Sequence, residues 1–213
     1  MRKHNYNRGF TVIELIVSTG IIVIVLGIVL AGYPKFRARS SLAALAREVG
    51  LLVRESQVYG LAVKEFENAS GKEFPPYGMH IAMNKPKEFI LFGDLDGGTP
   101  NKYDSGDGCG TKTGITECIR RDSFSGPEYI EKICVIPGGG QGGSGSGLEE
   151  ICSNDKDVPE LNITFRRPDP EAVIVISDGN VRYNGAKIYL RSNRDSAETK
   201  EVRVWITGQI SIM

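Results

Sequence analysis

An apolar stretch near the N-terminus, broken by one acid, constrains this chain more than any other feature. Residues Phe10–Tyr33 read FTVIELIVSTGIIVIVLGIVLAGY, and Glu14 is the only charged residue among them. A helix needs about 20 mostly apolar residues to cross the hydrocarbon core of a bilayer, and this stretch is long enough. We therefore expect a membrane-spanning helix rather than the buried helix of a soluble protein.

The residues before this stretch predict its orientation. Residues 1–9 are short and polar, and they carry Arg2, Lys3 and Arg8 without any acid. Basic residues before an apolar span favour a cytoplasmic N-terminus and an extracytoplasmic remainder. Two other interpretations are open: a secretory signal cut near Ala31, and an uncut signal anchor.

Glu14 favours a third interpretation, in which the chain is cut after Gly9. A carboxylate at the middle of an apolar span raises the free energy of membrane insertion by about 2.5–3.5 kcal/mol. A simple signal or anchor gains nothing that would offset this cost. Glu14 lies four residues after Phe10, which is one helical turn. Cleavage between Gly9 and Phe10 creates an α-amine, and a carboxylate one turn along can neutralise such an amine on a neighbouring subunit.

The residues from Gly9 to Val17, GFTVIELIV, resemble the type IV prepilin signature. That signature is a basic leader ending in Gly, followed by Phe, Thr-Leu-Ile-Glu and an apolar helix. Val12 stands where Leu is commoner. The resemblance implies that prepilin peptidase cleaves after Gly9 and methylates the Phe10 amine. It also implies that Glu14 acts in subunit docking.

The helical pattern continues beyond the apolar stretch. Pro34 removes a backbone donor, so we expect it to kink the helix there or to end it. An apolar stripe then recurs at steps of three and four, which predicts one face of an amphipathic helix. Its members are Leu42, Leu45, Val49, Leu52, Ser56, Tyr59, Val63 and Phe66. Asn68–Gly71 is an end signal, so a continuous helix over 10–67 would be roughly 85 Å long.

After Pro75-Pro76 the pattern changes to short runs rich in Val, Ile, Phe and Tyr, bounded by turn residues. The expected strands are Tyr77–Met83, Glu88–Gly93, Tyr129–Ile136, Leu161–Arg166, Ala172–Ser177, Lys187–Arg191, Glu201–Thr207 and Ile210–Ile212. Asp178–Asn180 and Asn184-Gly185 are turn signals. These runs predict an α+β fold in which one long helix packs on antiparallel sheet.

These patterns divide the chain into four parts. They are a leader over 1–9, a transmembrane and assembly helix over 10–33, an amphipathic helix over 34–71, and a β-rich head over 72–213. Residues 137–147 form a glycine- and serine-rich insert, for which we expect a mobile loop because it has almost no side chains to bury.

Two segments resemble a narrower group, the H-type minor pseudopilins and the transformation-associated minor pilins. They are the helix Leu42–Val63 and the closing segment Val204–Ile210, although Gln209 stands where that group often has Arg. The resemblance implies a minor subunit of a type II secretion pseudopilus or a type IV pilus. Its implied partners are prepilin peptidase, other pilin or pseudopilin subunits, the inner-membrane assembly platform and membrane lipid. A major pilin, another pseudopilin type, a DNA-uptake minor pilin and a membrane-anchored or secreted ligand-binding module stay open.

The cysteines predict disulfides. The four are Cys109, Cys118, Cys134 and Cys152. An even set in a loop-rich region favours two disulfides in an oxidising compartment, and pairing neighbours closes short loops. Free buried thiols are an alternative. A zinc site is less well supported, because no C-x-x-C spacing occurs and both histidines, His4 and His80, lie far away in the sequence.

An acidic, glycine-rich loop over 93–107 is a candidate calcium site. Its carboxylates are Asp94, Asp96, Asp104 and Asp107. Calcium prefers several oxygen ligands on a flexible turn, but the spacing does not match an EF-hand. Acidic glycine loops are also common as solvated turns, so we expect no cofactor other than this possible calcium.

Charge and motifs argue against two other classes of function. Lys and Arg total 26, and so do Asp and Glu, which gives no reason to expect polyanion binding. Three arginines near the C-terminus could contact phosphates: Arg191, Arg194 and Arg203. Scattered arginines on a neutral domain are usually solvated, so we do not expect nucleic acid as a partner. Because no G-x-S-x-G, H-E-x-x-H or phosphate-loop motif occurs, we do not expect an enzyme.

Overall fold

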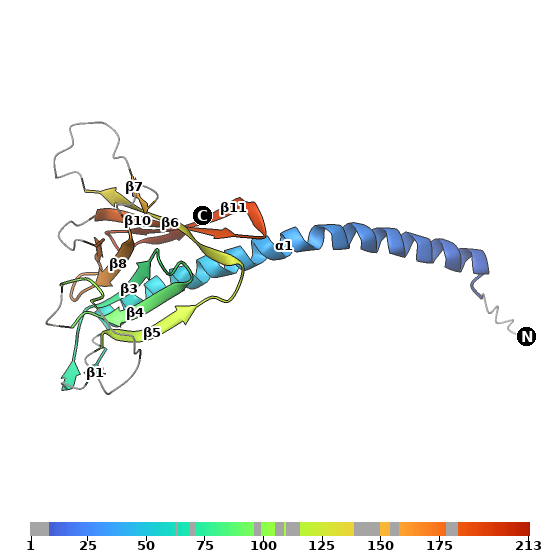
Figure 1. Cartoon of the computed structure of the whole chain (residues 1–213). Helices are drawn as coiled ribbons and strands as arrows, with labels where there is room; N and C mark the ends of the chain where they lie inside the picture. The colour runs from blue at the N-terminus through green and yellow to red at the C-terminus, as the bar shows by residue number, and fades with distance from the viewer. Residues whose placement is uncertain are drawn as a thin grey trace, which may run out of the picture.

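A computed structural model describes residues 9–62, 64–68, 71–95, 99–104, 109, 116–138, 150–153, 158–177 and 183–213. Helix α1 (Val12–Leu61) projects from a β-rich head, and its N-terminal half extends away from the head (Figure 1). The head contains two five-stranded antiparallel sheets. The fold is therefore α+β, as the sequence predicts.

Both ends of α1 have local causes. The Thr11 side chain caps the first turn, because its Oγ1 accepts a hydrogen bond from the Glu14 N–H at 3.3 Å. The helix continues through Pro34, so this proline does not end it. It ends at Leu61, where the Ala62 N–H donates to the Val58 carbonyl, and the predicted extension to residue 67 is wrong.

The cause of that error is a small hairpin. Strand β1 (Phe66–Asn68) pairs with strand β2 (Gly71–Glu73), and Asn68 lies opposite Gly71. The Asn68–Gly71 signal therefore belongs to a hairpin rather than to a helix terminus. Gly71 has φ 127°, a conformation that favours glycine, which explains why a turn forms at this place.

The C-terminal half of α1 packs against both sheets. The first members of the predicted stripe are buried, namely Leu42, Leu45, Val49, Leu52 and Ser56. The four apolar ones join the main hydrophobic core with residues of both sheets. Further along, the Tyr59 ring lies edge-on to the Tyr77 ring, with the ring centroids 5.7 Å apart. The amphipathic face of α1 thus forms the centre of the head's hydrophobic core.

The two sheets are named here by their central strands. The β10 sheet has the order β12-β11-β10-β6-β7, with bounds Ile210–Ile212, Asp195–Trp205, Tyr183–Ser192, Glu128–Pro137 and Ile151–Cys152. The β3 sheet has the order β5-β4-β3-β8-β9, with bounds Cys118–Ser123, Glu88–Gly93, Tyr77–Ala82, Glu160–Phe165 and Ala172–Val175.

All eight predicted strands overlap these elements, and the remaining differences have physical reasons. Strand β5 has the polar sequence CIRRDS and lies at a sheet edge, so it lacks the apolar run that marks a strand. Asn184-Gly185 lies inside β10 and not in a turn. Gly185 is needed there for close packing, since a Cβ at this position would lie 3.1 Å from Cε3 of Trp205. The predicted turn at 178–180 and residues 139–147 of the glycine-rich insert lie outside the described residues.

Gly60 sets the distance between α1 and the β3 sheet. It is buried, and a Cβ at this position would overlap the carbonyl oxygen of Phe165 in β8. Gly60→Ala should destabilise the head by about 1–3 kcal/mol through overpacking, which exceeds the gain in helix propensity of up to about 1 kcal/mol. Thermal unfolding of the full chain in detergent micelles measures this.

Gly27→Ala is the matched control, because nothing lies within 4 Å of a Cβ there. It should leave the melting temperature of the head unchanged. A Gly60→Ala protein that melts at or above the wild-type temperature would contradict this packing constraint.

Candidate functional site

The predicted cleavage site lies in an open segment before α1. Gly9 and Phe10 are both exposed, and the Phe10 side chain is 79% exposed. A Cβ at Gly9 would have no neighbour within 4 Å. This peptide bond is therefore accessible to a peptidase, while the rest of the leader, residues 1–8, lies outside the described residues.

Glu14 lies in the first turn of α1, exposed between apolar neighbours such as Ile13 and Leu15. Its backbone N–H donates to Thr11, and its backbone carbonyl accepts from Ser18 Oγ at 2.6 Å. Within the described part of the chain, its carboxylate has no ion pair or hydrogen bond. A carboxylate in apolar surroundings is costly without a partner, and the described residues of this chain supply none.

The N-terminal half of α1 presents apolar side chains on every side. The exposed large ones run from Val12 to Phe36 along the helix. This part of α1 is long and apolar enough to span a membrane, and none of that span is buried within the protein. A helix that is apolar all round requires lipid or other helices as its surroundings.

Comparison with known proteins bears on this segment. Residues 4–30 match the family model described as the prokaryotic N-terminal methylation motif. This motif indicates a type IV pilin-like precursor. It implies processing by prepilin peptidase and assembly with other pilin subunits, as the resemblance of Gly9–Val17 predicts. No curated protein and no solved structure matched the chain.

The match ends at residue 30, so the head must be interpreted from its own geometry. In the acidic loop, Asp94 Oδ2 accepts from the Asn101 N–H at 2.9 Å, and the Asp104 carboxylate accepts from the Thr99 N–H. Asp96 and Asp107 lie outside the described residues. The two described carboxylates therefore stabilise the loop backbone, and calcium at this loop stays a prediction.

Another group has the spacing of metal ligands. Cys134, Glu150 and Cys152 lie close enough together to share an ion. However, Cys134 and Cys152 form a disulfide, so their sulfurs are not available as thiolates. This group is therefore a disulfide beside a carboxylate, and Glu150 pairs with Lys187.

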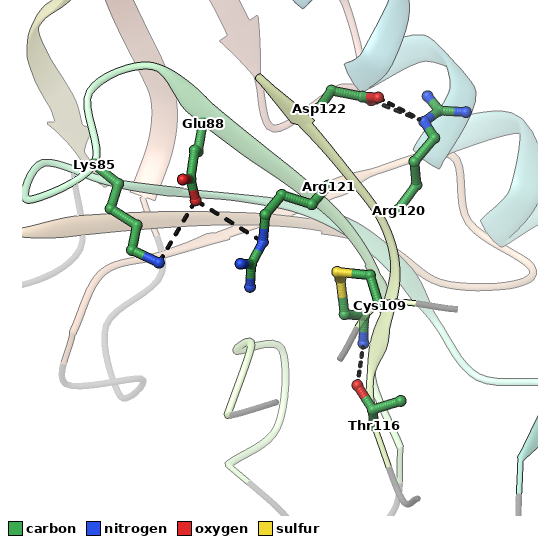
Figure 2. The surroundings of a disulfide bond; sticks show 8 residues. Lys85, Glu88, Cys109, Thr116, Arg120, Arg121 and Asp122 are labelled. Atoms are coloured by element: carbon green, nitrogen blue, oxygen red, sulfur yellow. Dashed lines mark hydrogen bonds and ion pairs between the residues drawn. A yellow bond between two sulfur atoms is a disulfide. The ribbon is translucent and has the colours of Figure 1, made fainter. Parts of the chain in front are cut away.

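Both disulfides join neighbours in the sequence, as predicted. Cys109 pairs with Cys118, and this bond ties the acidic loop to the start of β5. Cys134 pairs with Cys152, which lie opposite each other in β6 and β7. Figure 2 shows the first disulfide beside Thr116 and the arginines of β5. Closing loops of these lengths stabilises a fold by about 3 kcal/mol each in the chain-entropy model.

Glu117 is a buried carboxylate that the sequence does not single out. Its Oε2 accepts from the Asp104 N–H at 2.8 Å and its Oε1 from the Leu95 N–H at 3.4 Å. Burial raises the pKa of Glu117 to about 6, and the charges of Asp94 and Asp104 also raise it, against the two backbone hydrogen bonds. Glu117 thus binds the backbone of the acidic loop at two points, Leu95 and Asp104. No local sequence motif predicts these contacts.

Two of the three C-terminal arginines form ion pairs with carboxylates of the same chain. Arg191 pairs with Glu131, and Arg203 pairs with Glu201 at 2.7 Å while lying near the Trp205 ring. Arg194 is exposed. Neighbouring carboxylates therefore neutralise the charges of Arg191 and Arg203.

Glu117 gives the head a stability that depends on pH. Because its pKa is raised from 4.5 to about 6, the folded state binds the proton more tightly than the unfolded state. Its contribution to stability should therefore fall by about 2 kcal/mol as the pH rises from 4.5 through 6. Glu117→Gln should remove this step in denaturant unfolding curves of the full chain in micelles.

Glu131→Gln, in the other sheet, is the control and should retain the step. An unchanged pH profile in Glu117→Gln would show that this carboxylate is not the titrating group.

Proposed function

We propose that this protein is a structural subunit, and a minor one, of a type II secretion pseudopilus or a type IV pilus, without catalytic activity. The observation that carries the proposal is an N-terminal methylation motif on the unburied apolar half of α1. The one carboxylate in that half, Glu14, has no partner among the described residues. A helix of this kind is complete only when other subunits surround it.

The assembly mechanism follows from these surroundings. The apolar half of α1 holds the precursor in the membrane, with its N-terminus in the cytoplasm and its head outside. Cleavage after Gly9 frees the Phe10 amine. The Glu14 carboxylate of one subunit then meets the amine of its neighbour, so that both charges are neutralised as the helix leaves lipid for a helix-lined filament core.

The assignment to a minor subunit is supported by the two segments with the finer resemblance, which meet in space. The C-terminal hairpin of β11 and β12 packs on the amphipathic half of α1. A Cβ at Gly50 would lie 3.0 Å from Ile212 Cδ1. The helix and the closing hairpin thus form one packed unit in the head.

Processing is tested by the mature N-terminus. We expect mass spectrometry of the native protein to find a chain that lacks residues 1–9 and begins with N-methylated Phe10. A chain that begins near Gly32 would indicate a conventional signal peptide, and an intact Met1 would indicate a simple anchor. Either result would overturn the proposal.

Docking is tested by Glu14→Ala. This change removes a charge from the apolar span, so membrane insertion should be retained or improved, while incorporation into filaments should fall strongly because the Phe10 amine loses its partner. Fractionation measures insertion, and immunoblots of sheared filaments measure incorporation.

Ser18→Ala, one turn further along the same helix, is the matched control and should incorporate normally. Normal incorporation of Glu14→Ala would remove the docking role assigned to this carboxylate.

A further inference from the structure

The outer face of the β3 sheet carries polar side chains that the assembly function does not use. Met79, Ile81 and Phe89 belong to the core beneath α1, so the residues that alternate with them point to the opposite face. Register brings four of these into one row across four strands: Arg121 of β5, Ile90 of β4, His80 of β3 and Asn162 of β8.

A cavity of about 250 Å³ lies over this row. His80, Ala82 and Ile90 come from the strands, Glu88 and Arg121 stand at one side, and Tyr103 comes from the acidic loop. Ala82 has a small side chain, which leaves room above the sheet. The volume is below the roughly 300–1,000 Å³ typical of sites for drug-sized ligands, so it suits a molecule with a single ring.

His80 is held rigidly in this cavity. It is 6% exposed, and its Nδ1 lies 2.8 Å from Asn162 Oδ1. The Tyr103 N–H donates to the same oxygen at 3.1 Å, so this atom acts as an acceptor and Nδ1 carries the hydrogen. Burial lowers the pKa of His80, which keeps the ring neutral. Its Nε2 is consequently a hydrogen-bond acceptor.

Tyr103 is fixed from two sides. Its ring centroid lies 5.0 Å from that of His80 and 5.6 Å from that of Phe92. An aromatic ring held in this way offers a firm surface to the C–H groups of a ligand without losing side-chain freedom on binding.

Glu88 and Arg121 have hydrogen-bonding capacity to spare. Glu88 Oε2 lies 3.8 Å from Arg121 Nε and 3.6 Å from Lys85 Nζ, and both distances are too long for hydrogen bonds (Figure 2). Glu88 Oε2 and Arg121 Nε are buried without a hydrogen-bond partner among the described residues. A hydroxyl group can accept from Arg121 and donate to Glu88 at once, which a purely cationic or anionic group cannot do.

The charges around the cavity balance. Lys85 and Arg121 are matched by Glu88 and Asp104, and Glu160 pairs with Lys102 at 2.9 Å. A balanced set of donors and acceptors selects a neutral ligand over an ion. We propose that this cavity binds a single sugar unit, whose hydroxyls bond to Glu88, Arg121 and His80 and whose ring packs on Tyr103.

Saturation-transfer NMR on the full chain tests this proposal, in micelles of an amine-oxide detergent that contains no sugar. The probes are glucose, galactose, mannose and N-acetylglucosamine, each as the free sugar and as its methyl glycoside. We expect transfer to at least one of them. Preference for the free form would indicate a free sugar, and preference for the glycoside would indicate the end of a glycan.

Two variants locate the binding. Ala82→Leu should abolish transfer by filling the cavity, and Glu88→Gln should weaken binding about tenfold, as the loss of a charge-assisted hydrogen bond does. Glu131→Gln is the matched control, since it removes a comparably buried carboxylate of the other sheet, and it should bind as the wild type does.

Circular dichroism and thermal unfolding establish that each variant is folded. If Ala82→Leu does not fold, the loss of saturation transfer in Glu88→Gln is the test of the binding site. Absence of transfer to all eight probes would overturn the proposal. So would undiminished transfer in Glu88→Gln, or in a folded Ala82→Leu.

Discussion

The charge of Glu14 in the apolar half of α1 is the constraint on which the rest of this protein depends. Every described neighbour along that part of the helix is uncharged, and the described residues supply no partner for the carboxylate. Because an unpaired charge in apolar surroundings is costly, the carboxylate needs a positive group nearby. In the proposed assembly, a neighbouring subunit provides that group through the helix and not through the head.

The head packs on the second half of the same helix. The same α1 that is apolar all round near its start carries a one-sided stripe further along, and this stripe forms the core with both sheets. Gly60 allows the backbone of β8 to approach closely. A head packed on the second half of a continuous helix has its position set by the first half, so in the proposed filament the helix would determine where the head lies.

The face of the β3 sheet that points away from α1 is organised by different interactions. Glu117 and the disulfide between Cys109 and Cys118 hold the acidic loop against this face. The loop in turn positions Tyr103 against His80. These contacts form a rigid polar cavity that takes no part in packing the helix. The proposed binding at the outer face and the proposed assembly through the N-terminus therefore depend on separate parts of the molecule.

The sequence by itself determined the features that rest on local patterns. The processing motif around Gly9, the apolar span, the stripe on α1 and strands such as β4 all depend on residues close together in the chain, and the neighbour pairing of the cysteines follows from short loops. Tertiary structure alone decided where α1 ends, why Gly185 lies within a strand, and that Glu117 and Asn162 hold distant backbone groups. These depend on partners brought together by sheet register, and register is set by packing over the whole head rather than by any single segment.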